Sequence, residues 1–145
     1  MFRLARLLFG VVLVLAFVPA QADDLTGADN LVCAAMTVVA CWEDGVCVEG
    51  LPEDLNVPQF IEIDLEAKLI QTTAASGENR VTPIEHLDSE EGMIALQGYE
   101  FGRGFTFVID EKTGRATVAI ATRGSAVIVF GSCTPMTTTA DSGRK

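Results

Sequence analysis

Hydrophobic and polar side chains alternate with a period of two residues along several stretches of this chain. In residues 61–66, three aliphatic side chains alternate with three acids. The clearest unit is residues 104–122, where two alternating runs flank a short turn that ends at Gly114. A period of two is typical of strands with one buried and one solvated face, and two such runs joined by a short turn predict a β-hairpin.

Turn signals separate such runs throughout residues 31–133, and no amphipathic helix of useful length lies between them. Residues 51–58 contain two prolines and predict a loop, residues 81–87 predict a weak edge strand interrupted by Pro83, and residues 88–92 predict an acidic turn. The runs leave no room for the helical crossovers of an α/β fold. We therefore predict an all-β fold after an N-terminal signal helix, in which an antiparallel meander of about eight strands forms a small barrel or curved sheet.

The first 22 residues have the pattern of a signal peptide. Arg3 and Arg6 precede an apolar run over residues 7–20, and Ala20 and Ala22 are small residues at the positions that a signal peptidase reads. The run is shorter than the roughly 20 residues that cross a bilayer, although an uncleaved anchor or a buried helix is the alternative. We expect cleavage after Ala22, a flexible lead-in over residues 23–30, a single β domain over 31–133, a disordered polar tail over 134–145, and a periplasmic or secreted protein.

Four cysteines remain after that cleavage, an even number in an exported chain, and none of their spacings is C-x-x-C. This pattern predicts disulfides rather than a redox pair or a zinc site. A hairpin with its turn at residues 43–45 places Cys41 opposite Cys47, so we predict a bridge between them. A second bridge between Cys33 and Cys133 would tie the first and last strands together, and the alternative is Cys41 with Cys133.

The chain is strongly acidic, with a formal net charge of −10, and removal of residues 1–22 takes away two arginines and no acid. Nucleic acid and anionic lipid surfaces would repel such a protein, and we expect no stable membrane anchor after signal cleavage. The charge favours a cationic envelope protein as partner, although acids also simply keep a small exported protein soluble.

Candidate catalytic residues are few. His86 is the only histidine, and Glu85 and Asp88 flank it. Ser125 and Ser132 lack the G-x-S-x-G pattern of a nucleophile elbow, so a hydrolase that uses His86 is the weakest hypothesis, and we expect this side chain to face solvent on an edge strand. The acids of residues 88–91 lack EF-hand spacing. We predict no enzyme, no metal site and no cofactor.

The segment 98–105 is the first candidate for binding, because glycines there surround Tyr99, Phe101 and Arg103. Such aromatic and cationic side chains are enriched at protein interfaces, although aromatic residues also fill cores. Trp42 is a further candidate anchor. The chain resembles small exported barrels such as lipocalin-like carriers and periplasmic lysozyme inhibitors. The resemblance is one of architecture and compartment, and it rests on no shared motif. The first hypothesis is a protein-binding or inhibitory module of the bacterial envelope, and the alternative is a lipocalin-like carrier of a small apolar ligand.

Overall fold

The computed structural model describes residues 24–76 and 78–136. The predicted signal peptide lies outside these residues, as does residue 137 onward of the predicted tail. The described chain forms ten strands and two short 3-10 helices, which in chain order are β1 (Asn30–Trp42), β2 (Cys47–Gly50), η1 (Pro52–Leu55), β3 (Phe60–Asp64), β4 (Leu69–Thr72), η2 (Ala74–Ser76), β5 (Val81–Pro83), β6 (His86–Glu90), β7 (Met93–Glu100), β8 (Arg103–Asp110), β9 (Arg115–Thr122) and β10 (Ser125–Pro135).

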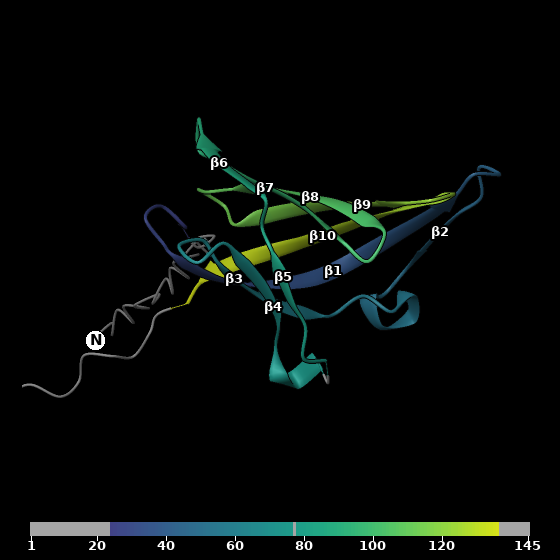
Figure 1. Cartoon of the computed structure of the whole chain (residues 1–145), viewed down its shortest axis with the longest axis horizontal. Helices are drawn as coiled ribbons and strands as arrows, with labels where there is room; N and C mark the ends of the chain where they lie inside the picture. Colours follow the sequence, from purple (N-terminus) through teal and green to yellow (C-terminus); the bar gives the residue numbers. More distant parts are fainter. Residues whose placement is uncertain (1–23, 77, 137–145) are drawn as a thin grey trace, which may run out of the picture.

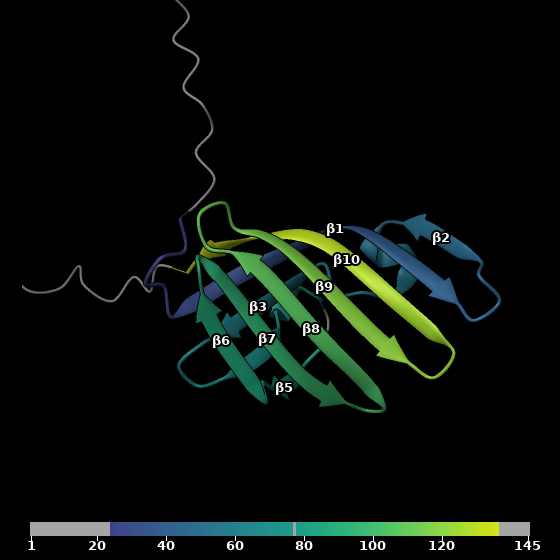
Figure 2. The same ribbon diagram turned by 90° about the horizontal axis from the view of Figure 1, so that it is seen from above.

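The predicted all-β fold is confirmed, since the strands form one antiparallel sheet curled into a half-barrel (Figure 1). The strand order is β5-β4-β3-β1-β10-β9-β8-β7-β6, and β2 pairs with β1 off this path. Strands that follow each other in the chain therefore pair, except β2 with β3 and β5 with β6, and β10 returns to pair with β1. In Figure 2 the green strands β7 to β9 lie in front of the teal strands β3 to β5, on the opposite side of the half-barrel.

The count of strands and two boundaries differ from the prediction. The weak strand predicted over residues 81–87 is divided into β5 and β6, because the backbone leaves the first edge of the sheet directly after Pro83. The acidic turn predicted over residues 88–92 is mostly strand β6, and only Glu91 and Gly92 form the turn, with φ values of 54° and 79°. Two central residues with positive φ are typical of the tight hairpin turn that matches strand twist.

The two edges of the sheet meet at one end of the half-barrel. Ile84 donates its backbone N–H to the Lys68 carbonyl at 2.8 Å, next to β4, and Glu85 donates its own to the Gln97 carbonyl of β7 at 2.8 Å. Residues 84–85 thus cross from the edge strand β5 to the edge strand β6. At this point residues 84–85 connect the two edges directly, and we call the gap between the edges the seam.

Inward-facing aliphatic side chains fill the same end, which we call the packed end. Along β8, Ile109 is fully buried, and it faces Ile94 and Ala116 on the neighbouring strands. The largest fully buried side chains of the described residues are Leu25, Leu31, Ile63, Leu96, Ile109, Val38 and Cys133. Burial of one such side chain contributes about 1.5 to 3 kcal/mol, so much of the hydrophobic stabilisation comes from this end.

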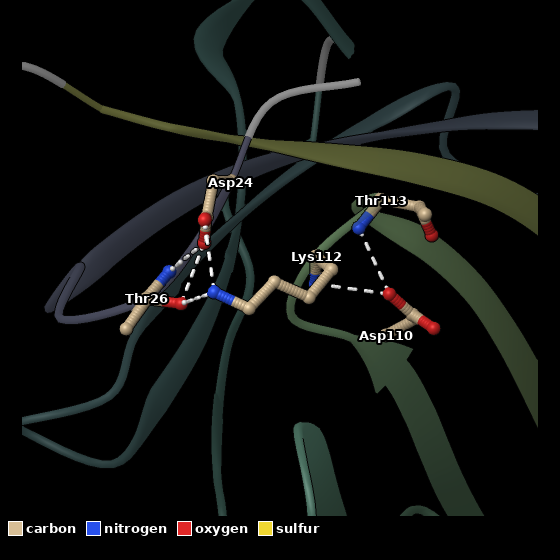
Figure 3. A network of polar contacts seen from close by, with 5 residues as sticks. All are labelled: Asp24, Thr26, Asp110, Lys112 and Thr113. Atoms are coloured by element: carbon tan, nitrogen blue, oxygen red, sulfur yellow. Dashed lines mark hydrogen bonds and ion pairs between the residues drawn. The ribbon is translucent and has the colours of Figure 1, made fainter. Parts of the chain in front are cut away.

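The segment before β1 belongs to the packed end, although the sequence predicts a flexible lead-in there. Leu25 is only 1% exposed, and its backbone N–H donates to the Glu111 carbonyl at 2.7 Å. Figure 3 shows how the neighbouring polar groups hold it: Lys112 Nζ lies 3.0 Å from both Asp24 Oδ2 and Thr26 Oγ1. An apolar side chain and a polar clamp therefore attach residues 24–26 to the β8–β9 turn.

This clamp predicts a dependence of stability on pH. Hydrogen bonds from the hydroxyl and the backbone N–H of Thr26, and then from Lys112, lower the pKa of Asp24 from 3.8 to about 2. A carboxyl with a lowered folded-state pKa stabilises the fold above its ordinary pKa and loses that contribution as the pH falls through the folded value. We expect Asp24→Asn to be less stable than the wild type at pH 6, and this deficit to shrink strongly as the pH falls to about 2, as measured by urea unfolding. An equal deficit at both values would contradict this.

Asp110 is the last residue of β8 and stabilises the turn that follows, beside the clamp. Hydrogen bonds from the side chain and the backbone N–H of Thr113, and from the backbone N–H of Lys112, lower the pKa of Asp110 (Figure 3). The carboxylate thus satisfies backbone donors that the turn leaves unpaired, which is a common use of aspartate in turns. Its contribution has the same sign of pH dependence as that of Asp24.

Both disulfides predicted from the sequence are present. Cys33 is bonded to Cys133 and Cys41 to Cys47, and in each pair the two residues stand directly opposite each other in the strand register. The bridge from β1 to β10 joins positions 100 residues apart, whereas the hairpin bridge spans six. Two disulfides indicate an oxidising, non-cytoplasmic environment.

The last described strand continues beyond the predicted domain end at Cys133. Thr134 pairs with Val32 and Pro135 with Leu31, so the first two residues of the predicted tail belong to β10. Among the described residues, none of the helices combines the length and hydropathy needed to cross a membrane.

Candidate functional site

A cavity of about 130 Å³ lies inside the half-barrel, next to the packed end. Its walls come from β1, β3, β4, β5, β7, β8, β9 and β10, together with the loop before β3. The apolar lining residues are Cys33, Ala34, Ala35, Val57, Pro58, Ile61, Ile70, Phe105, Phe107, Ala116, Val118, Ile120, Val129 and Gly131. A concave, mainly apolar space of this kind, open on one side, is the usual form of a small-molecule site.

Small residues on the central strands leave this space. Ala35, Ala116 and Gly131 occupy inner positions at the level where the packed end uses leucine and isoleucine. Gly131 is required by the backbone, because a Cβ there would collide with the Ala34 carbonyl oxygen at the bulge of β1. The cavity therefore follows from the register of β1 with β10.

Two phenylalanines of β8 form an aromatic wall. The rings of Phe105 and Phe107 meet edge to face, with centroids 5.8 Å apart. Phe105 lies over Gly98 of β7, where a Cβ would collide with the ring and would stand 3.0 Å from the Pro83 carbonyl oxygen. Gly98 thus permits both the position of this ring and the close approach of β5 to β7.

Three charged side chains form the rim of the cavity: Arg80, Glu100 and Arg103. Arg80, one residue before β5, has its Nε 3.6 Å from Glu100 Oε2 at the end of β7. The pair joins the two edges of the sheet, above the point where Gly98 and Pro83 meet. Arg80 Nη2 also lies 3.8 Å from Glu78 Oε2. Arg80 is therefore shared between Glu100, across the seam, and Glu78, two residues away on its own side.

The four candidate binding residues from the sequence lie at the end of the half-barrel opposite the packed end. Phe101 occupies the tip of the β7–β8 hairpin with a φ of 47° and is 81% exposed, and Tyr99 is exposed beside it. Trp42 is 45% exposed at the end of β1. Of the four, Arg103 alone contributes to the cavity.

Comparison with protein-family models, curated proteins and solved structures yields no match. The chemistry of the cavity and its rim is therefore the basis on which a function can be assigned.

The residues considered for catalysis and metal binding are not gathered into a site. His86 is exposed on the edge strand β6, as expected, and the described residues give its ring no hydrogen-bond partner. Within residues 24–76 and 78–136, no three His, Cys, Asp or Glu side chains are grouped to hold a metal ion.

The cavity was not predictable from the sequence. Arg80 directly precedes the weak strand predicted over residues 81–87, Glu100 stands at the end of β7, and their meeting depends on the closure of the seam. The available signal was the placement of Ala35, Ala116 and Gly131 at inward positions of alternating runs. Small residues there leave volume only if the sheet curls, which the local pattern does not specify.

Proposed function

We propose that this protein binds a small, mainly apolar molecule in the cavity inside the half-barrel. The observation that carries the proposal is an apolar cavity of about 130 Å³ beside the packed end. The small residues Ala35, Ala116 and Gly131 leave this space unfilled in the row of the sheet that contains Ile109. A fold stabilised only by its core would gain from filling this space as well, since cavities cost stability.

The volume limits the size of the ligand. An engineered apolar cavity of roughly 150 Å³ in another protein takes up benzene, so a phenyl ring or a short alkyl group is the size class that fits here. The edge-to-face pair of Phe105 and Phe107 offers aromatic contact to such a group. A ligand of this size has few atoms, and we expect dissociation constants of roughly 10 μM to 1 mM.

A matched pair of tryptophan variants tests the proposal. Ile120 lines the cavity, whereas its neighbour Ala119 is exposed on the opposite face of β9. We expect Ile120→Trp to fill the cavity and to weaken binding of 2-phenylethanol at least tenfold, and Ala119→Trp to bind like the wild type. Two-dimensional ¹H–¹⁵N NMR titration measures such weak binding and also shows whether each variant is folded.

Two results would contradict the proposal. One is that the amides of cavity-lining residues show no saturable chemical-shift changes with 2-phenylethanol or with carboxylate and ammonium compounds of similar size. The other is equal affinity of a folded Ile120→Trp variant and the wild type. Native mass spectrometry of freshly purified protein gives an independent measure, because a resident ligand adds mass.

A second candidate is the protein-binding or inhibitory module of the bacterial envelope. Phe101 supports it, because a hairpin tip that holds a phenylalanine with positive φ and leaves it 81% exposed has no evident use in the core. A cationic envelope protein is the partner that the net charge of −10 favours. Phe101→Ala would abolish this activity and Ile120→Trp would not, so the variants separate the two candidates.

The compartment forms part of the proposal. The two disulfides, together with the charged, apolar and small-residue pattern of residues 1–22, support export to the periplasm or beyond. A carrier or scavenger of small apolar molecules would be useful there, outside the cytoplasmic membrane.

A further inference from the structure

We infer that the ligand of this cavity is a small carboxylate, an aryl or short alkyl acid whose apolar body enters the cavity and whose anionic head group binds Arg103. This inference rests on the proposed binding function and specifies its chemical class. Three observations on the rim carry it: the distribution of charge, the state of each arginine and the spacing along β8.

The charge around the cavity is opposite to that of the rest of the protein. Two of the six Lys and Arg residues in the described part of the chain line the cavity, against one of its eighteen Asp and Glu residues. The whole chain carries a net charge of −10. Among the described residues, basic side chains are thus over-represented at this cavity relative to the acidic chain as a whole, and they favour an anion there.

The two rim arginines are in different states. Arg80 is bound by Glu100 and Glu78, with N–O distances of 3.6 and 3.8 Å, and this pairing bridges the seam. Arg103 stands opposite Glu100 in the β7–β8 register but forms no ion pair with any of the described residues within 4.0 Å. Its guanidinium therefore has free donors, and a guanidinium binds a carboxylate through two parallel hydrogen bonds.

The spacing along β8 brings the two kinds of contact together. Alternate residues of a strand face the same side, so Arg103 stands on the same side of β8 as Phe105 and Phe107. Two residues along a strand span about 6.8 Å. A phenyl group beside Phe105 thus places a carboxylate within reach of the flexible Arg103 side chain.

A cationic ligand is the competing possibility, since Glu100 also lines the cavity. Glu100 already accepts Arg80, and its side chain is only 17% exposed. An ammonium group would have to displace Arg80 and open the seam, whereas Arg103 has no ion-pair partner among the described residues and can bind a carboxylate. The rim therefore favours the anion.

Three compounds of nearly equal size test this inference at pH 7: phenylacetate, 2-phenylethanol and 2-phenylethylammonium. Measured by NMR titration, phenylacetate should bind the wild type about fivefold more tightly than 2-phenylethanol, which is the scale of an ion pair at a partly exposed rim. The ammonium compound should bind most weakly. Arg103→Glu should reverse the order of the two charged compounds.

Arg115→Glu is the matched control, because it changes the net charge equally but stands at the start of β9, next to the packed end and outside the cavity lining. It should retain the preference for phenylacetate. Equal binding of phenylacetate and 2-phenylethanol, or a preference for the ammonium compound, would overturn the inference while leaving the binding function intact. Failure of all three compounds to bind would instead remove the binding function itself.

Discussion

Replacing Cys33 and Cys133 together by alanine is expected to lower the free energy of unfolding by about 4 to 5 kcal/mol. The bridge closes a loop of 100 residues and joins β1 to β10, the pair through which the two ends of the chain meet in the sheet. In the chain-entropy model a cross-link of this span removes about 4.7 kcal/mol of unfolded-state entropy. Small domains have only about 5 to 15 kcal/mol in total, so guanidinium titration should find the variant unfolded or nearly so.

Alanine at Cys41 and Cys47 is the internal control. This bridge spans six residues of a hairpin, and the same model assigns it about 2 kcal/mol. Both variants lose one bridge and two sulfur atoms, and they differ mainly in the length of the loop released and in burial. A larger loss for the hairpin pair than for Cys33 and Cys133 would show that loop closure is not what stabilises this sheet.

The second large effect is expected at Leu25. Its alanine variant should lose about 2 to 5 kcal/mol, because Leu25 is fully buried among the core side chains and its truncation leaves a cavity there. Leu25 precedes the first strand, and its backbone N–H donates to the Glu111 carbonyl in the turn between β8 and β9. Thermal unfolding followed by circular dichroism measures the loss.

Leu51→Ala provides the comparison for Leu25. Leu51 is 54% exposed in the loop before η1, so its truncation should change stability by less than about 1 kcal/mol. Equal effects of the two substitutions would mean that residues 24–26 contribute little to the core. In that case the hydrogen bonds around Asp24 would form a surface contact that adds little to the stability of the core.

The packed end stabilises the fold, whereas the cavity beside it costs stability. Leu25, Ile84 and the turn after β8 close one end, and the long-range disulfide holds the sheet where its first and last strands pair. These contacts compensate for the stability that the unfilled volume costs beside Phe105 and Phe107. Ligand binding should in turn raise the melting temperature, since it favours the folded state alone.

Local chemistry made much of the fold predictable. The alternation in residues 61–66 and 104–122 predicts strands because a half-buried strand requires it, and the structure has β3, β8 and β9 there. Cys41 and Cys47 were predictable as a pair because a hairpin turn holds them at neighbouring positions. Cys33 with Cys133 needed one further step, that the first and last strands should meet.

The candidate site was less predictable, and for a physical reason. Tyr99, Phe101 and Trp42 were selected for their chemistry, and the structure leaves all three exposed outside the cavity. Only Arg103 was identified among the lining residues. Whether an aromatic side chain fills a core or faces solvent depends on which face of its strand is buried, and near a glycine-rich turn the alternation no longer reports that face.

By itself, the sequence determined the strands, most of the turns, the net negative charge and the Cys41–Cys47 bridge, since each depends on composition or on neighbours in the chain. Only the tertiary structure decided that the sheet curls until Ile84 and Glu85 join its edges, that Arg80 meets Glu100 across the seam, and that small residues on three strands enclose one cavity. Curvature sums the twist of many strand pairs, and no single segment encodes that sum.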